Sequence, residues 1–252
     1  MRTASIAGIL RGGQGINNMD PGMRRDDRNM QTTKTINREK VIEDTMKYAK
    51  ETLEGEGSGH DWWHVWRVWK NAKHIGETED CDMFVVELAA LLHDIADFKF
   101  HDGDLTVGPR VACEWLESQG VEESTVQHVC EIIASTSFKG AQVDSSVKTV
   151  EAMVVQDADR LDAMGAIGIG RAFAYGGHKN REMYNPNIKP EQHDSFEKYA
   201  NNNSPTLNHF YEKLFLLKDL MNTQTAKKIA QERHDFMQTY LEQFYKEWEG
   251  EL

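Results

Sequence analysis

The chain has 252 residues, of which 39% are hydrophobic and 28% are charged, a balance typical of a globular protein and not of a disordered one. Its net charge of −12 argues against a general nucleic-acid-binding surface, which would need a basic footprint. No apolar stretch approaches the roughly 18 residues of a transmembrane helix, so we expect no membrane span. A small phosphorylated substrate stays compatible with the charge, because a few local cations or a metal ion suffice to bind it.

The cysteines bear on the redox environment of the protein. Cys81, Cys113 and Cys130 are odd in number and widely spaced. This spacing predicts neither a zinc finger nor a disulfide framework. The simplest interpretation is a reducing compartment, and we therefore expect a cytoplasmic protein.

The N-terminal residues 1–36 differ in composition from the rest of the chain. They contain Gly, Asn, Asp, Arg and Met with little periodicity, so we expect a disordered tail. Arg2 and Arg11 without an acid in the first 19 residues are features of a transit peptide, although the acids that begin at Asp20 are not. Organelle import through the tail is thus an alternative to a cytoplasmic location. Residues 37–252 are expected to form one domain.

Apolar residues after position 36 follow the helical period almost throughout. Five helices are expected in turn: one marked by Val41, Ile42, Met46 and Ala49, one marked by Trp62, Val65, Trp66 and Trp69, one in the apolar run 84–92, one over 107–116 that stops near Gly120, and one over 125–134. A sixth helix is expected over 147–161, because Ser145 and Ser146 are good N-cap residues.

The second half of the chain contains a glycine-rich helix, a long loop and two closing helices. Glycines in the helix expected over 163–175 lower its helix propensity, which predicts close packing against another backbone or a ligand. Residues 176–203 indicate a long loop, and such loops are often functional. One closing helix is marked by Leu207, Phe210, Tyr211, Leu214, Leu217 and Leu220, and the other begins after Thr223 and carries Ile229, Phe236, Tyr240, Phe244 and Trp248. With no alternating strand pattern of useful length, the predicted fold is all-α.

The dipeptide His93-Asp94 ends the most apolar run of the sequence. Burying an imidazole or a carboxylate without a partner is costly, and a divalent cation would satisfy both. By itself the dipeptide more often marks a helix end where both side chains meet water, because short motifs have a high false-positive risk. His64 on the second helix and Asp159 on the sixth can join the pair, since helical folds build metal sites from side chains on facing helices.

The expected ligand set contains two nitrogens and two oxygens, which does not suit Ca²⁺. We expect one divalent ion, with manganese as first choice and nickel, iron, cobalt, zinc or magnesium as alternatives. A second metal bound through His101 or His128 is a further alternative.

These positions resemble the H…HD…D signature of the HD-domain phosphohydrolase superfamily. The segments GHDWWHVWRV, LLHDIADFKF, VVQDADRLDAMGAIGIGRAFAYGG and HFYEKLFLLKDLMNTQTAKKIAQERHDFM are similar to small stand-alone HD hydrolases, some of them described as nucleotide pyrophosphohydrolases. The resemblance covers about residues 37–249 and implies an all-α fold, a divalent metal and hydrolysis of phosphoester or phosphoanhydride bonds. The family pattern favours Asp159, directly before Arg-Leu, as the aspartate ligand. Asp157 and Asp162 are then expected to be supporting or helix-end groups.

The resemblance implies nucleoside triphosphate pyrophosphohydrolysis as the expected activity. We expect a metal-activated water as the nucleophile, because a divalent ion lowers the pKa of bound water. The candidate catalytic residues are His60, Asp61, Asp97 and Lys99, and the candidate substrate-binding residues are Arg67, Lys139, Arg160 and Arg171. Asp61 could instead only cap the helix that follows it. Trp62 and Trp63 could stack on a base or belong to the core.

Other functions fit the same pattern. A 5′-nucleotidase, a phosphodiesterase or a non-catalytic metal- and nucleotide-binding module would each use such a site. The expected partner is a small-molecule nucleotide, with no nucleic acid and no membrane. The closing helices could pack internally or against a second copy, so a homodimer is an alternative. The base, the sugar and the number of phosphates leave no signature in the sequence.

Overall fold

The computed structural model describes residues 36–55, 59–96, 104, 106–136, 147–191 and 204–252. All regular secondary structure in these ranges is helical, which confirms the expected all-α fold. The tail predicted for residues 1–36 lies outside the described residues except for Ile36, so its disorder stays a prediction.

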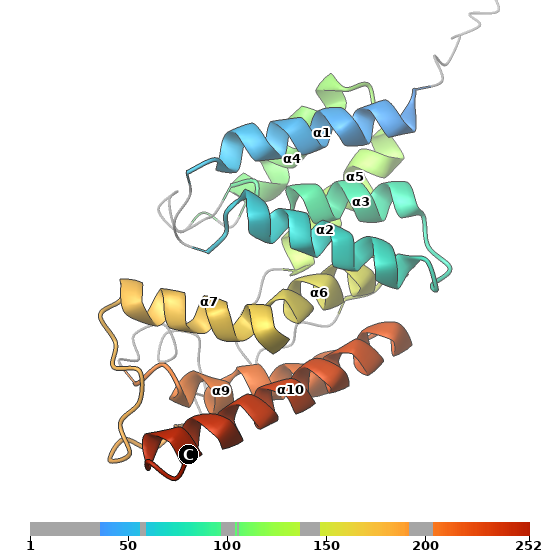
Figure 1. Cartoon of the computed structure of the whole chain (residues 1–252). Coiled ribbons are helices and arrows are strands. Elements are labelled where there is room, and N and C mark those ends of the chain that lie inside the picture. Colours follow the sequence, from blue (N-terminus) through green and yellow to red (C-terminus); the bar gives the residue numbers. More distant parts are fainter. Residues whose placement is uncertain (1–35, 56–58, 97–103, 105, 137–146, 192–203) are drawn as a thin grey trace, which may run out of the picture. The chain divides into compact units, whose positions relative to one another are not determined.

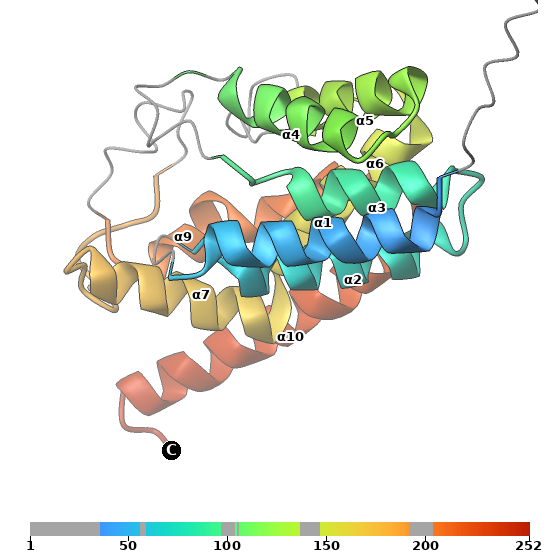
Figure 2. The same ribbon diagram turned by 90° about the horizontal axis from the view of Figure 1, so that it is seen from above.

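Helix α3 (Met83–Leu92) lies at the centre of the helices that precede α7 in the chain. Its residues from Phe84 to Leu92 are all buried, as expected for a helix that is apolar on every side. It packs against α1 (Arg38–Leu53), α2 (Trp62–Gly76), α5 (Glu123–Thr136) and α6 (Val150–Asp162) (Figures 1 and 2). The apolar run therefore delivers His93-Asp94 to the interior of the bundle.

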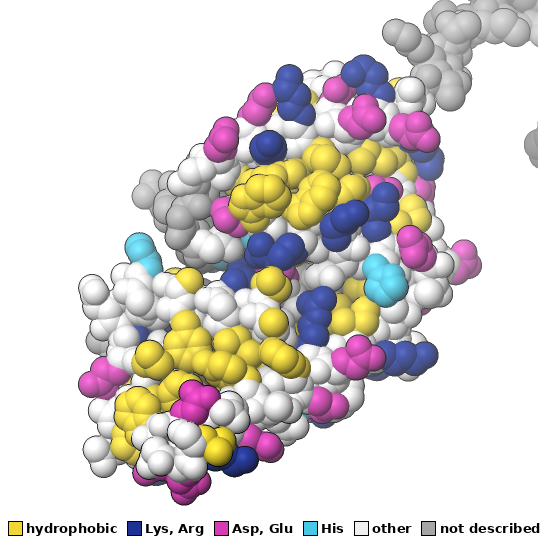
Figure 3. All heavy atoms as spheres, in the orientation of Figure 1, with side chains coloured by type: hydrophobic (Ala, Val, Ile, Leu, Met, Phe, Trp, Pro, Cys, Tyr) yellow, Lys and Arg dark blue, Asp and Glu magenta, His cyan; other side chains and the backbone are white. Residues whose placement is uncertain are grey.

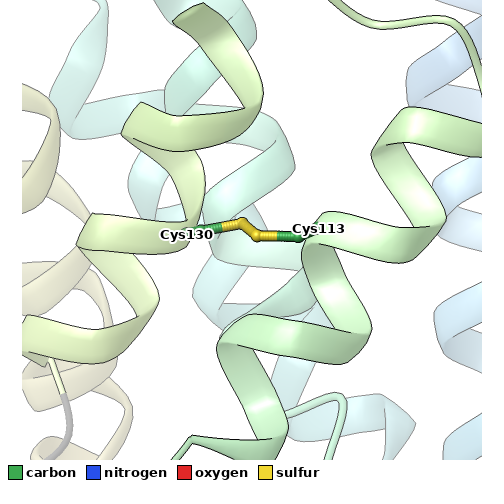
Figure 4. The surroundings of a disulfide bond; sticks show 2 residues. All are labelled: Cys113 and Cys130. Atoms are coloured by element: carbon green, nitrogen blue, oxygen red, sulfur yellow. A yellow bond between two sulfur atoms is a disulfide. The ribbon is translucent and has the colours of Figure 1, made fainter. Parts of the chain in front are cut away.

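Helices α4 (Val107–Ser118) and α5 (Glu123–Thr136) pack against each other and are joined by a disulfide bond between Cys113 and Cys130 (Figure 4). The expectation that the cysteines are unpaired is wrong for these two, and Cys81 is free. The Cα atoms of Cys113 and Cys130 lie 6.1 Å apart, because α4 and α5 meet on the faces that carry these two cysteines. The spacing of cysteines along the chain does not reveal which faces meet.

Helix α6 (Val150–Asp162) begins later than predicted. Its N-cap is Thr149, which has extended backbone angles and accepts a hydrogen bond from the Ala152 backbone N–H. The predicted caps, Ser145 and Ser146, lie outside the described residues.

Helix α7 (Gly165–His178) follows α6 after a sharp break. Gly165 has φ +67°, a conformation that L side chains rarely adopt. A Cβ on Gly168 would lie 2.2 Å from the carbonyl oxygen of Ala163, and one on Gly176 would lie 2.0 Å from Oγ1 of Thr206. The close packing against backbone that the glycines predicted is therefore confirmed at Gly168, whereas a Cβ on Gly170 would meet nothing within 4 Å.

The first closing helix is not a continuous helix, and that prediction was wrong. A short α9 (Asn208–Glu212) is followed by a 3₁₀ helix, η2 (Leu214–Leu220), because Lys213 departs from helical angles with φ −142°. The spacing of three between Leu214, Leu217 and Leu220 matches the 3₁₀ period. Helix α10 (Gln224–Trp248) has Thr223 as its N-cap, as predicted, and packs on α6, α7 and η2.

On the face seen in Figure 3, hydrophobic side chains gather over α1 and α2 and again over α7 and α10, with Lys and Arg side chains between the two areas. The exposed hydrophobic residues include Trp63, Ile167 and Phe236. Among the described helices, none is both long enough and apolar enough to cross a membrane.

Candidate metal centre

Helix α2 carries His64 into the interior of the bundle. Asp61 is the N-cap of this helix, and its carboxylate accepts a hydrogen bond from the His64 backbone N–H at 2.9 Å. The His64 side chain is 1% exposed. Its Nε2 lies 3.2 Å from Oδ2 of Asp94 and 3.4 Å from Oδ1 of Asp159.

His93 and Asp94 follow the last residue of α3. The Nδ1 of His93 lies 2.8 Å from the backbone carbonyl oxygen of Ala90. A carbonyl oxygen only accepts hydrogen bonds, so Nδ1 carries the hydrogen and Nε2 of the neutral ring presents its lone pair. This Nε2 lies 3.3 Å from Oδ2 of Asp94 and 4.0 Å from Oδ1 of Asp159.

The carboxylate of Asp162 orients the imidazole of His64. Its Oδ2 lies 2.7 Å from Nδ1 of His64, and its side chain is 2% exposed. Burial alone would raise the pKa of Asp162, but hydrogen bonds from His64 and Arg67 hold it well below its usual range. The ionised carboxylate only accepts, so His64 also carries its hydrogen on Nδ1 and turns Nε2 toward the centre.

The two Nε2 atoms of His64 and His93 lie 3.2 Å apart. In neutral rings both would present lone pairs to each other, next to the carboxylates of Asp94 and Asp159, which is unfavourable unless a proton or a cation lies between them. Burial lowers the pKa of His93, yet the charge of Asp94 and Asp159 raises it to about 9. The environment thus favours positive charge, and the mixed nitrogen and oxygen donors fit a divalent transition metal.

His60 extends this cluster on its more exposed side. Its Nδ1 lies 2.6 Å from Oδ2 of Asp94, and its side chain is 32% exposed. Two groups of side chains have the spacing of metal ligands, namely His60, His64 and Asp94, and His64, His93 and Asp159, with ligand atoms within 4.8 Å of one another. The four positions predicted as ligands therefore converge, with His60 beside them. His128, considered as a ligand of a second metal ion, instead places Nε2 3.1 Å from Oγ1 of Thr149.

The three described arginines predicted to bind substrate have protein partners. Arg67 donates from Nε to Oδ1 of Asp162 at 2.6 Å and from Nη2 to Oδ2 at 3.0 Å. Arg171 donates to Oδ2 of Asp162 at 2.6 Å and to the Gly59 carbonyl oxygen at 2.8 Å. Arg160 is buried and donates to the carbonyl oxygen of Leu220. The predicted residues Asp97, Lys99 and Lys139, and the alternative ligand His101, lie outside the described residues.

Asp157 faces away from the centre and holds the start of α10. Its fully buried carboxylate accepts hydrogen bonds from the backbone N–H groups of Asn222 and Thr223 and from both of their side chains. Of the two roles predicted for Asp157, these contacts match the helix-end role and not support of the ligands, and the helix that it binds is one that the sequence did not indicate.

Sequence reasoning missed a second contact of α10, in this case with the helices that carry His64 and Asp159. Arg233 donates to the carbonyl oxygen of Leu161 and, at 3.2 Å, to Oδ1 of Asn71. It thereby joins α10 to the end of α6 and to the middle of α2. A lone arginine in a polar helix carries no local signal for this contact.

The sequence and the fold of this chain are similar to those of known proteins. The family model for the HD domain matches residues 62–164. The protein YpgQ of Bacillus subtilis is 39% identical over 212 residues, covering 84% of this chain and 95% of YpgQ. The crystal structure of an HD-superfamily hydrolase from Bacillus thuringiensis has 46% identity and a TM-score of 0.68, covering 84% of this chain and 99% of that one. The structure of YpgQ in complex with ADP has 34% identity on superposition and a TM-score of 0.64, with coverage of 82% and 97%.

Proposed function

This chain belongs to the HD superfamily of hydrolases, and from that premise we propose that it hydrolyses nucleoside triphosphates to nucleoside monophosphates and pyrophosphate. The observation that carries the proposal is the convergence of Nε2 of His64 and of His93 on the carboxylates of Asp94 and Asp159. The ADP bound to YpgQ supports a nucleotide as the class of substrate.

We assign His64, His93, Asp94 and Asp159 as the ligands of one divalent ion, with manganese as first choice and nickel, iron, cobalt, zinc or magnesium as alternatives. When bound, the ion lowers the pKa of water and neutralises charge on the phosphoryl oxygens. The hydrogen bonds of the two histidines through Nδ1 support the assignment, because they direct both Nε2 atoms toward the centre.

Proton transfer is assigned to the exposed side of the cluster. His60 binds Asp94 through Nδ1, so its Nε2 is the nitrogen that can exchange a proton with substrate or solvent. Asp97 follows Asp94 by three residues and stays a second candidate. Asp61 caps α2, and its role in this proposal is to hold the start of the helix that carries His64.

Phosphate binding is assigned to cations around the cluster. Arg67 uses Nε and Nη2 for Asp162 and so retains Nη1 for a phosphoryl oxygen. Lys99 and Lys139 are further candidates from the sequence. Arg160 is less suited to this role, because its guanidinium is buried against Leu220.

The proposal is tested with a panel of metals and nucleotides. Protein stripped with a chelator and reloaded with each ion is incubated with nucleoside triphosphates, monophosphates and cyclic nucleotides, and the products are identified. We expect pyrophosphate and a monophosphate from the triphosphates. A nucleoside from a monophosphate would instead identify a 5′-nucleotidase, and opening of a cyclic nucleotide a phosphodiesterase. Binding without turnover under every metal would identify a non-catalytic module.

A matched pair of variants tests the ligand assignment. We expect His93→Ala to lose bound metal and activity, measured by elemental analysis and product release. His128→Ala, which removes an imidazole bound to Thr149, is expected to retain both. Wild-type metal content in His93→Ala would contradict the assignment.

A further inference from the structure

Arg171 connects two segments that are far apart in the sequence. From α7, its Nη1 donates to Oδ2 of Asp162 at 2.6 Å and its Nη2 donates to the carbonyl oxygen of Gly59 at 2.8 Å. One rigid guanidinium therefore joins the end of α6 to the turn before α2. A planar group with fixed donor directions sets the relative position of two acceptors, which a flexible ammonium does not.

The first contact of Arg171 acts on His64. Asp162 receives hydrogen bonds from His64 Nδ1, from two nitrogens of Arg67 and from Arg171. Asp162 is 2% exposed, so its position depends on these partners and not on water. Arg67 binds both carboxylate oxygens and keeps the charge of Asp162 compensated without Arg171. The added effect of Arg171 is to fix the position of Oδ2, the atom that orients His64.

The second contact acts on His60. The carbonyl that Arg171 binds belongs to the peptide bond between Gly59 and His60. Gly59 has φ +96°, a backbone conformation open to glycine, so this turn depends on external contacts for its orientation. His60 in turn places Nδ1 2.6 Å from Oδ2 of Asp94. Arg171 thus reaches the cluster from two sides, through the partner of His64 and through the backbone of His60.

We propose that Arg171 is a positioning residue, which holds His64 and His60 in place at the metal centre and does not bind the substrate phosphates. The proposal rests on the ligand set assigned under the proposed function. It predicts that Arg171 affects metal affinity even when no nucleotide is present, which a phosphate-binding arginine would not do. Loss of a group that orients a ligand typically weakens metal binding by about 10- to 100-fold.

The test measures Mn²⁺ affinity by calorimetry on metal-free protein without nucleotide. For Arg171→Met we expect a dissociation constant raised about 10-fold or more. Arg171→Lys keeps the charge but reaches only one of the two acceptors, and we expect it to be weakened as well. Arg110→Met is the matched control, since the Arg110 side chain is exposed on α4 and forms an ion pair with Glu114 on the same helix. It is expected to retain wild-type affinity.

Steady-state kinetics distinguish a positioning role of Arg171 from direct contact with the substrate phosphates. A positioning role predicts that kcat falls while KM for the nucleoside triphosphate changes little. Unchanged Mn²⁺ affinity together with a raised KM would overturn the proposal and identify a phosphate contact, and wild-type behaviour of Arg171→Met would overturn it too. If Arg171→Met does not fold, Arg171→Lys decides, because wild-type Mn²⁺ affinity in that variant contradicts the proposal.

The outcome for Arg171 is distinguishable from the outcome for the proposed function. A wild-type protein that binds Mn²⁺ but hydrolyses no nucleotide contradicts the proposed function only, and the affinities still decide the role of Arg171. A wild-type protein that binds none of the metals contradicts the ligand set and this proposal together.

Discussion

Three carboxylates on α6 have different surroundings although they lie within six residues of one another. Asp157 is fully buried and binds the start of α10, whereas Asp159 is 33% exposed and faces His64 and His93. Asp162 lies one helical turn beyond Asp159, on the same side, and approaches the opposite edge of the His64 ring. All three are aspartates, so the position of each one around the helix axis determines which neighbour it contacts.

This division predicts opposite effects for substitutions at two aspartates that are two residues apart. Asp157→Asn leaves buried N–H donors without a charged acceptor, so we expect the free energy of unfolding to fall by about 2–4 kcal/mol with metal stoichiometry retained. Asp159→Asn removes a proposed ligand from a partly exposed position, so we expect loss of metal with little change in stability. Urea denaturation and elemental analysis on both variants measure the two quantities. Retained metal in Asp159→Asn with loss in Asp157→Asn would reverse the assignment.

At the scale of the element, the α4–α5 pair shows how two helices are linked to each other. Helix α4 begins after the segment that follows His93-Asp94, and α5 ends before the segment that contains Lys139. The disulfide between Cys113 and Cys130 closes a loop with a sequence separation of 17. A cross-link of this length restricts the unfolded chain and thereby stabilises the folded state.

We expect reduction of this disulfide to lower the free energy of unfolding by about 3 kcal/mol, the size associated with a loop of this length. Denaturation with and without a phosphine reductant measures the difference. The double variant Cys113→Ser with Cys130→Ser is the control, and its stability is expected to be insensitive to the reductant. Mass spectrometry without reductant that finds both thiols free would contradict the pairing.

At the scale of the whole molecule, acid stability depends on histidines that the fold holds neutral. His209 lies on α9, where burial and the nearby charges of Lys213 and Arg181 lower its pKa to about 3, compared with 6.5 in a model peptide. The unfolded chain therefore takes up a proton at a pH where the folded protein does not. The contribution of neutral His209 to the free energy of unfolding is fully present above about pH 6.5 and is lost as the pH falls toward 3.

We expect the variant His209→Gln to show a shallower fall of stability with decreasing pH than the wild type. Between about pH 6 and pH 4.5 the slopes should differ by up to about 1.4 kcal/mol per pH unit, the effect of one proton. Denaturant unfolding at a series of pH values measures both slopes. Parallel curves for the two proteins would show that His209 is not held neutral in the fold.

Two predictions about the whole molecule remain open to direct measurement. The homodimer and the cytoplasmic location stay predictions. For the homodimer, the packing of α10 on α6 and α7 leaves Phe236 exposed. Light scattering on the purified protein decides the first and microscopy of a tagged chain the second.

Much of the architecture was predictable from the sequence because its causes are local. The periodicity of apolar residues indicated the helices up to α7 and the last one, and Thr223 indicated where α10 begins. The order of His64, His93-Asp94 and Asp159 indicated a shared site, because each lies on or just beyond a helix with a buried face. The positions of the chemistry-bearing residues and the superfamily could be identified without a structure.

Only the tertiary structure decided which side chains face one another. The disulfide, the break at Lys213 and the contacts of Arg171 and Arg233 all join segments whose proximity depends on packing between helices. Such contacts are set by the faces of several helices at once, whereas a pattern along the chain reports one helix at a time. For this reason the sequence indicated the histidines and aspartates of the proposed centre, and the fold determined which side chains orient them.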